Sequence, residues 1–215
     1  MSFKNIGLSN ALLDELSGKK FIQATPIQEA AIPAILNGKD VLGIASTGSG
    51  KTASFVLPLL MNLQKNLVTK NRHVTVLVLA PTRELAKQVQ EVFYEFSSKL
   101  RNPIKSMAVY GGVSINPQMI GLQGVNVLVA TPGRLLELVE AKAVHLSDIT
   151  TLVLDEADKM LNLGFQEEMN RIFELLPKKR QNLLFSATLS DNLNNITAFL
   201  LNDPLVIKIA AKENS

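Results

Sequence analysis

The chain has 215 residues, of which 47% are hydrophobic and 19% charged, and its formal net charge is +3. These values suit a single folded domain with a sizeable core, argue against disorder, and leave the kind of partner open. The lack of cysteine excludes disulfides and thiolate metal sites. The two histidines, His73 and His145, are far apart in sequence, so we expect surface residues and no histidine-based metal site.

No apolar stretch approaches the roughly 20 residues that a membrane-spanning helix needs. A signal peptide would need an apolar core within the first 20 positions. Charged residues interrupt that stretch: Lys4, Asp14, Glu15, Lys19 and Lys20. We therefore expect a soluble, cytoplasmic protein that is neither exported nor inserted into a membrane.

Short apolar runs alternate with helix-length segments along the chain. The runs cover residues 40–45, 74–80, 105–110, 126–130, 151–155, 182–187 and 204–209. Such runs predict strands that are buried on both faces. Two intervening segments carry apolar stripes at helical spacing: Leu85, Val89, Val92, Phe93, Phe96 and Leu100, then Phe165, Met169, Ile172, Phe173 and Leu176. This alternation predicts one α/β domain, with a mainly parallel sheet of about seven strands flanked by helices and with ligands at the strands' carboxyl ends.

The first motif along the chain is ATPIQ, at positions 24–28. Thr25 and Gln28 have the spacing of a capping box, and Pro26 stands where the first helical residue would be, so the motif predicts a helix start. The amide of Gln28 could also pair with the N6 and N7 edge of adenine, which guanine does not present. The two roles are compatible, and the residues alone do not choose between them.

The first predicted strand runs into the sequence ASTGSGKT, from Ala45 to Thr52. Apart from Ala45 in place of the first glycine, it matches the phosphate-binding loop GxxxxGK[ST] and stands between a strand and a helix, as that loop requires. Gly48 and Gly50 allow backbone N–H groups to face a phosphate, while Lys51 supplies charge and Thr52 a magnesium ligand. A plain glycine and serine turn would give no reason for Lys and Thr just inside the helix.

Three further motifs follow predicted strands and so share the same sheet edge. They comprise Pro81, Thr82 and Arg83 of PTREL, the pair Gly111 and Gly112, and Thr131, Pro132, Gly133 and Arg134 of TPGR. Helix caps and turns explain each motif by itself. Together, their hydroxyls, helix N-terminal amides, glycine backbone and arginine are groups that hold a sugar-phosphate backbone without reading its bases.

Three carboxylates, Asp155, Glu156 and Asp158, follow the fifth apolar run. Acids crowded together repel one another unless a positive charge lies among them. A parallel sheet brings Asp155 near the phosphate-binding loop, so we expect Mg²⁺ held by Thr52 and Asp155, with Glu156 polarising an attacking water. An acidic helix N-terminus is the alternative, but it does not explain an Asp that ends an apolar strand.

In chain order, the motifs are FIQATPIQ (21–28), ASTGSGKT (45–52), PTRELA (81–86), GG (111–112), TPGR (131–134), DEAD (155–158) and SAT (186–188). This series resembles the first RecA-like domain of a DEAD-box RNA helicase of bacterial type. Lys20 departs slightly from it, because the family often has glycine there. The resemblance implies a RecA-like P-loop NTPase domain over residues 1–215, in which 1–37 recognise adenine and 38–215 form the P-loop core.

The resemblance also implies roles for individual residues. It gives nucleotide contacts to Phe21, Thr25, Gln28, Ser46, Thr47, Gly48, Ser49, Gly50, Lys51 and Thr52, and catalysis to Lys51, Thr52, Asp155 and Glu156. RNA contacts fall to Pro81, Thr82, Arg83, Gly111, Gly112, Thr131, Pro132, Gly133 and Arg134. Ser186 and Thr188, which could merely cap the next helix, would instead bind Asp158 and couple nucleotide state to RNA grip.

The function expected is an ATP- and Mg²⁺-dependent, RNA-stimulated ATPase domain of a monomeric helicase that unwinds RNA duplexes locally. Two alternatives stay open: a P-loop ATPase acting on DNA or protein, and a nucleotide-gated RNA clamp. No arginine has the signature of a finger among Arg72, Arg83, Arg101, Arg134, Arg171 and Arg180. The resemblance places that arginine in a second RecA-like domain beyond Ser215, so we expect the chain alone to be nearly inactive.

Overall fold

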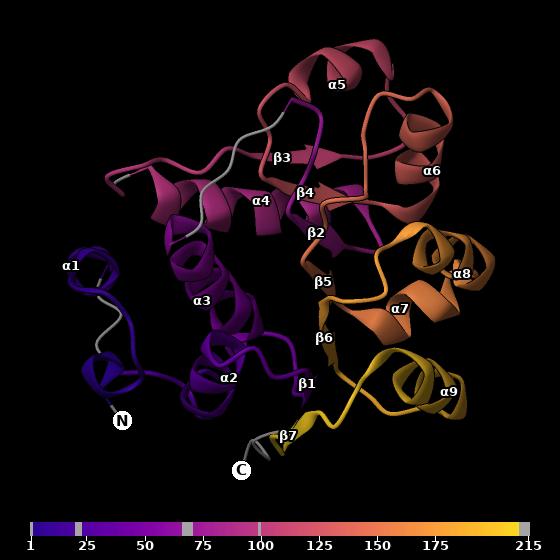
Figure 1. Ribbon diagram of the computed structural model, residues 1–215. Coiled ribbons are helices and arrows are strands. Elements are labelled where there is room, and N and C mark those ends of the chain that lie inside the picture. Colours follow the sequence, from indigo (N-terminus) through magenta and orange to yellow (C-terminus); the bar gives the residue numbers. More distant parts are fainter. Residues whose placement is uncertain (1, 20–22, 66–70, 99, 211–215) are drawn as a thin grey trace.

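The predicted strands form one parallel sheet (Figure 1). A computed structural model of the chain describes residues 2–19, 23–65, 71–98 and 100–210. The strands are β1 (Val41–Ile44), β2 (Val76–Leu79), β3 (Ser106–Val109), β4 (Val127–Ala130), β5 (Thr151–Leu154), β6 (Gln181–Ser186) and β7 (Leu205–Lys208). Their order across the sheet is β3-β4-β2-β5-β6-β1-β7, and every neighbouring pair is parallel. The predicted fold class is therefore confirmed.

Helices cover both faces of this sheet (Figure 1). One face is covered by α1 (Asn10–Gly18), α2 (Pro26–Leu36), α3 (Lys51–Lys65) and α4 (Arg83–Ser97). The other is covered by α6 (Pro132–Glu140), α7 (Ala157–Asn162), α8 (Gln166–Leu175) and α9 (Asp191–Leu200). The short helix α5 (Asn116–Gly121) connects β3 to β4, and a 3-10 turn spans Phe3–Asn5.

Two hydrophobic cores, one on each face, explain why the strands are apolar throughout. Within β2, Val76 and Val78 belong to one core, whereas Leu77 and Leu79 belong to the other. Successive side chains of a strand point to opposite faces, so a strand covered on both sides needs an uninterrupted apolar sequence. The strands therefore lack alternating polar residues because helices cover both faces of the sheet.

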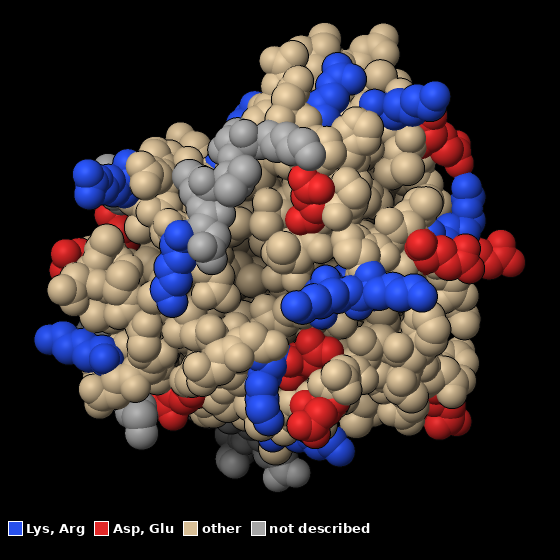
Figure 2. Space-filling model, viewed as in Figure 1, with Lys and Arg blue, Asp and Glu red and all other residues tan. Residues whose placement is uncertain are grey.

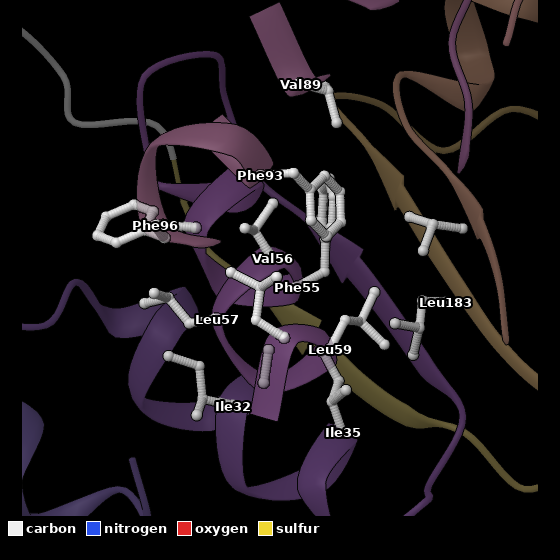
Figure 3. Packing of buried hydrophobic residues seen from close by; sticks show 14 of the residues in the cluster. Ile32, Ile35, Phe55, Val56, Leu57, Leu59, Val89, Phe93, Phe96 and Leu183 are labelled. Atoms are coloured by element: carbon white, nitrogen blue, oxygen red, sulfur yellow. The ribbon is translucent and has the colours of Figure 1, made fainter. Parts of the chain in front are cut away.

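Aromatic side chains of α3 and α4, Phe55, Phe93 and Phe96, lie in the core to which Val76 and Val78 belong (Figure 3). The ring of Phe55 on α3 lies 6.4 Å from the ring of Phe93 on α4 and 5.2 Å from that of Phe185 on β6, centroid to centroid. All three side chains are fully buried, and tilted ring pairs at these distances are favourable beyond their buried area. These contacts fix α3, and therefore its N-terminus, against the sheet.

A buried carboxylate, Asp40, ties β1 to the strands on both sides of it. Its side chain accepts hydrogen bonds from the backbone N–H of Asn182, at 2.8 Å, and of Asn202, at 2.9 Å. Asn182 belongs to β6, and Asn202 lies just before β7. The two bonds fix the start of β1, the strand that leads into the phosphate-binding loop.

The face drawn in Figure 2 shows no large patch of one charge that would indicate a partner. On the face drawn in Figure 2, basic and acidic side chains are interspersed over the described residues. No helix in the described parts of the chain combines the length and the apolar character needed to cross a membrane. Local geometry must therefore carry any functional argument.

Candidate nucleotide site and nucleic-acid interface

The phosphate-binding loop connects β1 to α3 and lies against the start of α2. Gly50 has a φ of +93°, in the left-handed region. A Cβ at this position would come within 2.5 Å of Gln28 Nε2 and 2.8 Å of Thr25 Oγ1. Glycine is thus required here twice, for its backbone conformation and for the close approach of the ATPIQ segment.

The side chain of Lys51, the lysine of the loop, is buried and hydrogen-bonded to the protein. Lys51 is the first residue of α3, its side chain is buried, and its Nζ donates a hydrogen bond to the carbonyl oxygen of Ala45 at 2.6 Å. Ala45 also donates its own N–H to Ser186 O, at 3.0 Å, on the neighbouring strand. The ammonium group therefore lies against the strand end that leads into the loop, close to the N-terminus of α3, and helix N-termini favour bound phosphate.

The ATPIQ segment starts α2, as its sequence predicts. Pro26 is the first helical residue, and Gln28 Oε1 accepts a hydrogen bond from Thr25 N at 2.9 Å. Gln28 Nε2 donates to Gly50 O at 3.2 Å, and the side chain is only 1% exposed. Both ends of the amide are therefore engaged within the protein, so pairing with adenine would require Gln28 to leave Gly50. Phe21 lies outside the described residues.

Two buried hydroxyl groups beside the loop are unused. Among the described residues, Thr25 Oγ1 and Ser49 Oγ are buried without a hydrogen-bond partner. A buried polar atom without a partner costs free energy, so such atoms often mark a place that a ligand or water completes. Thr25 precedes α2 and Ser49 belongs to the loop, but neither residue lines the nucleotide pocket.

The acids of DEAD follow β5, and the structure brings the first two to the loop as predicted. Asp155 is 4% exposed, and burial, followed by the negative charge of Glu156, raises its pKa from 3.8 to about 6. The nearby ammonium of Lys51 acts in the opposite direction. A pocket of about 320 Å³ brings these groups together with Thr52.

Glu156 has an unusual backbone. Its φ of +50° and ψ of +51° lie in the left-handed region, immediately before α7. For a residue with a side chain this conformation costs about 1–2 kcal/mol, and such strain gathers at functional turns. The turn points the Glu156 side chain into the same pocket as Lys51 and Asp155.

The site suits a magnesium ion bound partly by its substrate. The described residues contain no group of three or more His, Cys, Asp or Glu side chains able to hold a metal by themselves. Mg²⁺ usually binds through one or two carboxylates, with water and substrate phosphates completing its octahedron. Asp155, a buried carboxylate whose negative charge is disfavoured, and the Thr52 hydroxyl in the same pocket fit that donor set.

The third acid of DEAD contacts SAT. Asp158 Oδ2 accepts hydrogen bonds from Thr188 Oγ1 at 2.8 Å and from Thr188 N at 3.1 Å, while Ser186 Oγ donates to Thr188 O at 2.8 Å. Partial burial raises the pKa of Asp158, but hydrogen bonding by Thr188 and Ser186 outweighs it and holds the pKa below 3.8. The contact that the resemblance implies between DEAD and SAT is present.

PTREL lies beside these motifs at the carboxyl end of β2, where its threonine caps a helix as predicted. Thr82 Oγ1 accepts a hydrogen bond from Leu85 N at 3.3 Å and so caps α4. Thr82, Thr47, Glu156 and Asp158 all line a hollow of about 640 Å³ next to the nucleotide pocket. The loop, PTREL and DEAD therefore share one continuous surface.

The remaining motifs lie further along the same edge, over β3 and β4. Gly111 and Gly112 follow β3 and are exposed, and Gly112 has a φ of +78°. Thr131 precedes α6 without making a side-chain cap, and Pro132 is the first residue of that helix. Arg83 is exposed, but Arg134 is only 6% exposed and its guanidinium group bonds to the protein itself.

Several site features have no signal in the sequence. The amide of Gln118 bonds to the backbone of Tyr110, next to the glycine pair. The rings of His73 and His145 stack at 4.6 Å between centroids, and His73 Nδ1 lies 3.1 Å from Asp148 Oδ2. His145 is exposed, as predicted, and His73 is half-buried. The sequence gives no sign of their contact, which arises because the start of β2 and the segment before β5 run side by side.

Comparisons with known proteins agree with this geometry. Residues 25–196 match the DEAD/DEAH box helicase family. The chain is 47% identical over 214 residues to the DEAD-box ATP-dependent RNA helicase CshA of Streptococcus pneumoniae, covering 99% of this chain and 40% of that protein. For CshA of Limosilactobacillus reuteri the values are 44% identity over 214 residues, 99% and 42%. The chain thus spans about two fifths of the length of these relatives.

A solved structure gives the same result for the fold. The crystal structure of a DEAD box protein from the hyperthermophile Methanococcus jannaschii superposes with a TM-score of 0.88 at 37% sequence identity. The match covers 97% of this chain and 56% of that one. The RecA-like fold implied by the motifs is therefore confirmed. Together with the family match over most of its length, this shows that the chain belongs to the DEAD/DEAH box helicase family.

Proposed function

We propose that the chain is the first RecA-like domain of an RNA helicase, in which ATP binding and hydrolysis control the grip on RNA and local unwinding of a duplex. The observation that carries this proposal is the convergence of Lys51, Asp155 and Glu156 on one pocket, next to the contact between Asp158 and Thr188. Asp158 also lines the hollow that the nucleotide site shares with Thr82 of PTREL, so the contact lies between the nucleotide site and that motif.

The residues of the pocket divide the chemistry among them. Backbone N–H groups at the start of α3 and the ammonium of Lys51 bind the β- and γ-phosphates. Thr52 and Asp155 would hold Mg²⁺, which supplies charge neutralisation on the phosphate oxygens when bound. Glu156 orients a water molecule and accepts a proton from it as the water oxygen bonds to the γ-phosphorus and the bond to the ADP oxygen breaks.

Two glycines support a nucleic-acid ligand at the other motifs. Gly111 and Gly133 have no left-handed φ, and a Cβ on either would meet no atom within 4 Å. The fold therefore does not require glycine at these positions, although glycine in a helix such as α6 costs about 1 kcal/mol relative to alanine. Close approach by the sugar-phosphate backbone of RNA explains why no side chain is present.

A second RecA-like domain would supply what this chain lacks. Phosphoryl transfer is accelerated by an arginine finger, yet the arginines of the described residues lie outside the nucleotide pocket. We propose that ATP and RNA are bound in a cleft between two domains, and that this chain lines one side of it. The relatives are more than twice as long as this chain and are therefore long enough to include a second domain on the other side of the cleft.

The test compares this chain with the complete protein. Steady-state ATP hydrolysis is measured with single-stranded RNA, with single-stranded DNA of the same sequence, and without nucleic acid. RNA should stimulate the complete protein far more than DNA and leave the short chain nearly inactive. Equal stimulation by DNA would favour the alternative of a DNA-dependent ATPase. ATP-dependent RNA binding without strand displacement would favour the RNA clamp.

A further inference from the structure

The segment that carries the glycine pair is held from one side by the buried side chain of Gln118. Gln118 Oε1 accepts a hydrogen bond from Tyr110 N at 3.1 Å, and Gln118 Nε2 donates one to Tyr110 O at 3.1 Å. The side chain is 7% exposed. Its amide therefore pairs with both backbone groups of Tyr110, as a neighbouring strand would, just where β3 ends.

The other side of the glycine pair is held by Arg134. Its Nη2 donates a hydrogen bond to Val113 O at 2.8 Å, and its Nε donates to Glu137 Oε2 at 2.7 Å. The group is buried and points into the protein from α6. In the structure Arg134 thus anchors the glycine segment, a contact that differs from the direct contact with RNA that the family resemblance implies.

The anchored segment contributes nothing visible to the core. Gly111 and Gly112 are exposed, and a Cβ on either would meet open space. Two buried polar side chains therefore fix an exposed stretch of bare backbone, although burying such groups costs free energy. The Gln118 amide is paired at both ends, whereas Arg134 donates through Nε and Nη2 and its buried Nη1 has no hydrogen-bond partner. The stability of the fold does not require the exposed glycine backbone to be held in one conformation. Binding of a ligand that contacts this backbone does require it.

Tyr110 extends the same surface with positive charge. The guanidinium carbon of Arg83 lies 5.0 Å from the centroid of the Tyr110 ring, and Lys87 Nζ lies 5.4 Å from it. Both distances are within the range of cation–π attraction. Because Gln118 fixes the backbone of Tyr110, it also fixes the ring on which these two cations rest.

We propose that Gln118 and Arg134 are positioning residues for RNA. They hold residues 110–113 at both ends, so that the glycine backbone and the two cations on Tyr110 form one prearranged surface for a sugar-phosphate backbone. Prearrangement raises affinity because the loop loses no conformational freedom on binding. This inference rests on the proposed function, since it assigns the anchors of the same RNA site.

The test replaces Gln118 in the complete protein and measures RNA-stimulated ATP hydrolysis. Gln118→Leu keeps the size of the side chain but leaves both backbone groups of Tyr110 unpaired. We expect the concentration of single-stranded RNA giving half-maximal stimulation to rise about tenfold, the effect of losing one hydrogen bond to a charged group. The slope of the logarithm of that concentration against the logarithm of salt concentration should decrease by about the amount expected for one phosphate contact. The affinity for ADP should equal that of the parent protein.

Gln123→Leu is the matched control, because Gln123 is an exposed glutamine that follows the same helix. If Gln118→Leu fails to fold, Gln118→Glu decides, since it keeps the acceptor for Tyr110 N but loses the donor to Tyr110 O. A lower melting temperature with an unchanged RNA requirement and salt dependence would overturn the inference, leaving Gln118 a purely structural residue. A parent protein that RNA does not stimulate would instead contradict the proposed function.

Discussion

Two regions lie along one edge of the sheet and are built in opposite ways. The nucleotide region, over β1, β5 and β6, buries its polar groups: Gln28, Lys51 and Asp155 are all less than 8% exposed. The region proposed to bind RNA, here called the nucleic-acid region, lies over β2, β3 and β4 and exposes Arg83 and the glycine pair, although Gln118 and Arg134 beneath them are buried. Burial shifts the pKa of a charged group and so alters its chemistry. Exposed backbone and charged groups can bind a phosphate backbone without such a shift.

The difference also decides what each region can tolerate. A charge in the nucleotide region is disfavoured by burial, which together with Glu156 raises the pKa of Asp155 to about 6. Removing a partner there leaves another charge buried and unpaired, which is costly. At Arg83 and the glycine pair, which are exposed, water can replace a lost contact. Substitutions should therefore have large effects in the first region and graded effects in the second.

The largest effect is expected for Lys51→Ala. The buried ammonium is the only lysine lining the nucleotide pocket in the described residues, and its loss should weaken ADP binding by at least about 100-fold, or roughly 3 kcal/mol. Calorimetric titration measures this affinity. Lys65→Ala, at the exposed end of the same helix, is the control. Unchanged ADP affinity in Lys51→Ala would place phosphate binding elsewhere.

Glu156→Gln should separate binding from chemistry within the nucleotide region. In the complete protein, ATP binding should persist while RNA-stimulated turnover falls about 10²-fold, the usual contribution of a general base. The measurements are steady-state hydrolysis and ATP affinity on the same preparation. Glu167→Gln, on the first turn of α8, provides the control. A turnover near that of the parent would show that another group activates the water.

Thr188→Val tests the link between the two regions. It removes the 2.8 Å hydrogen bond from Thr188 Oγ1 to Asp158 and keeps the bond from the backbone. We expect the stimulation of hydrolysis by RNA to fall about tenfold, because a hydrogen bond to a carboxylate is lost. Thr197→Val, which removes a hydroxyl bonded only within α9, should leave stimulation intact. If both variants behave alike, the contact does not couple the regions.

Gln28→Ala tests whether the buried amide of Gln28 distinguishes adenine from guanine. The ratio of ATP to GTP affinity should fall by about fivefold, since the edge that distinguishes adenine is no longer paired. Competition titrations with the two nucleotides give this ratio directly. Gln123→Ala serves as the control. A ratio that does not change would mean that Gln28 acts only through its bonds to Thr25 and Gly50.

The smallest effect is expected in the exposed region, for Gly133→Ala. The added methyl group meets no protein atom, so thermal stability should be kept or rise, by up to about 1 kcal/mol. The RNA concentration for half-maximal stimulation should nevertheless rise about threefold, because the methyl group meets the RNA. Gly18→Ala, at the end of α1 and equally uncrowded, is the control. A stabilised variant with parental RNA affinity would remove Gly133 from the interface.

The same contrast explains which features the sequence predicts. The seven strands are confirmed because burial on both faces forces continuous apolar runs. The phosphate-binding loop and DEAD are also recognisable, since their residue types serve one chemistry in one order. The cap at Thr82 and the proline at position 26 follow local rules that need no tertiary information. The cap of α9 is Ser190, not Ser186 or Thr188, which the sequence also offered for that role.

Other features depend on contacts between distant segments and so leave no local trace. The inward orientation of Arg134 is set by Val113, on another connection of the sheet. The left-handed backbone of Glu156 is imposed by the packing around it, against its intrinsic preference. Gln118 resembles any glutamine of a short helix, and the pairing of His73 with His145 requires the strand order, which periodicity does not reveal.

The position of β1 between β6 and β7 has a consequence for biosynthesis. Asp40, at the start of β1, bonds to backbone groups that lie 142 and 162 residues further along the chain. Contacts at such separations form slowly, and on the ribosome they must wait for the C-terminal strands to emerge. A nascent chain therefore carries its nucleotide loop long before that loop has a sheet to support it. Nucleotide binding would then begin only when nearly the whole domain has been made.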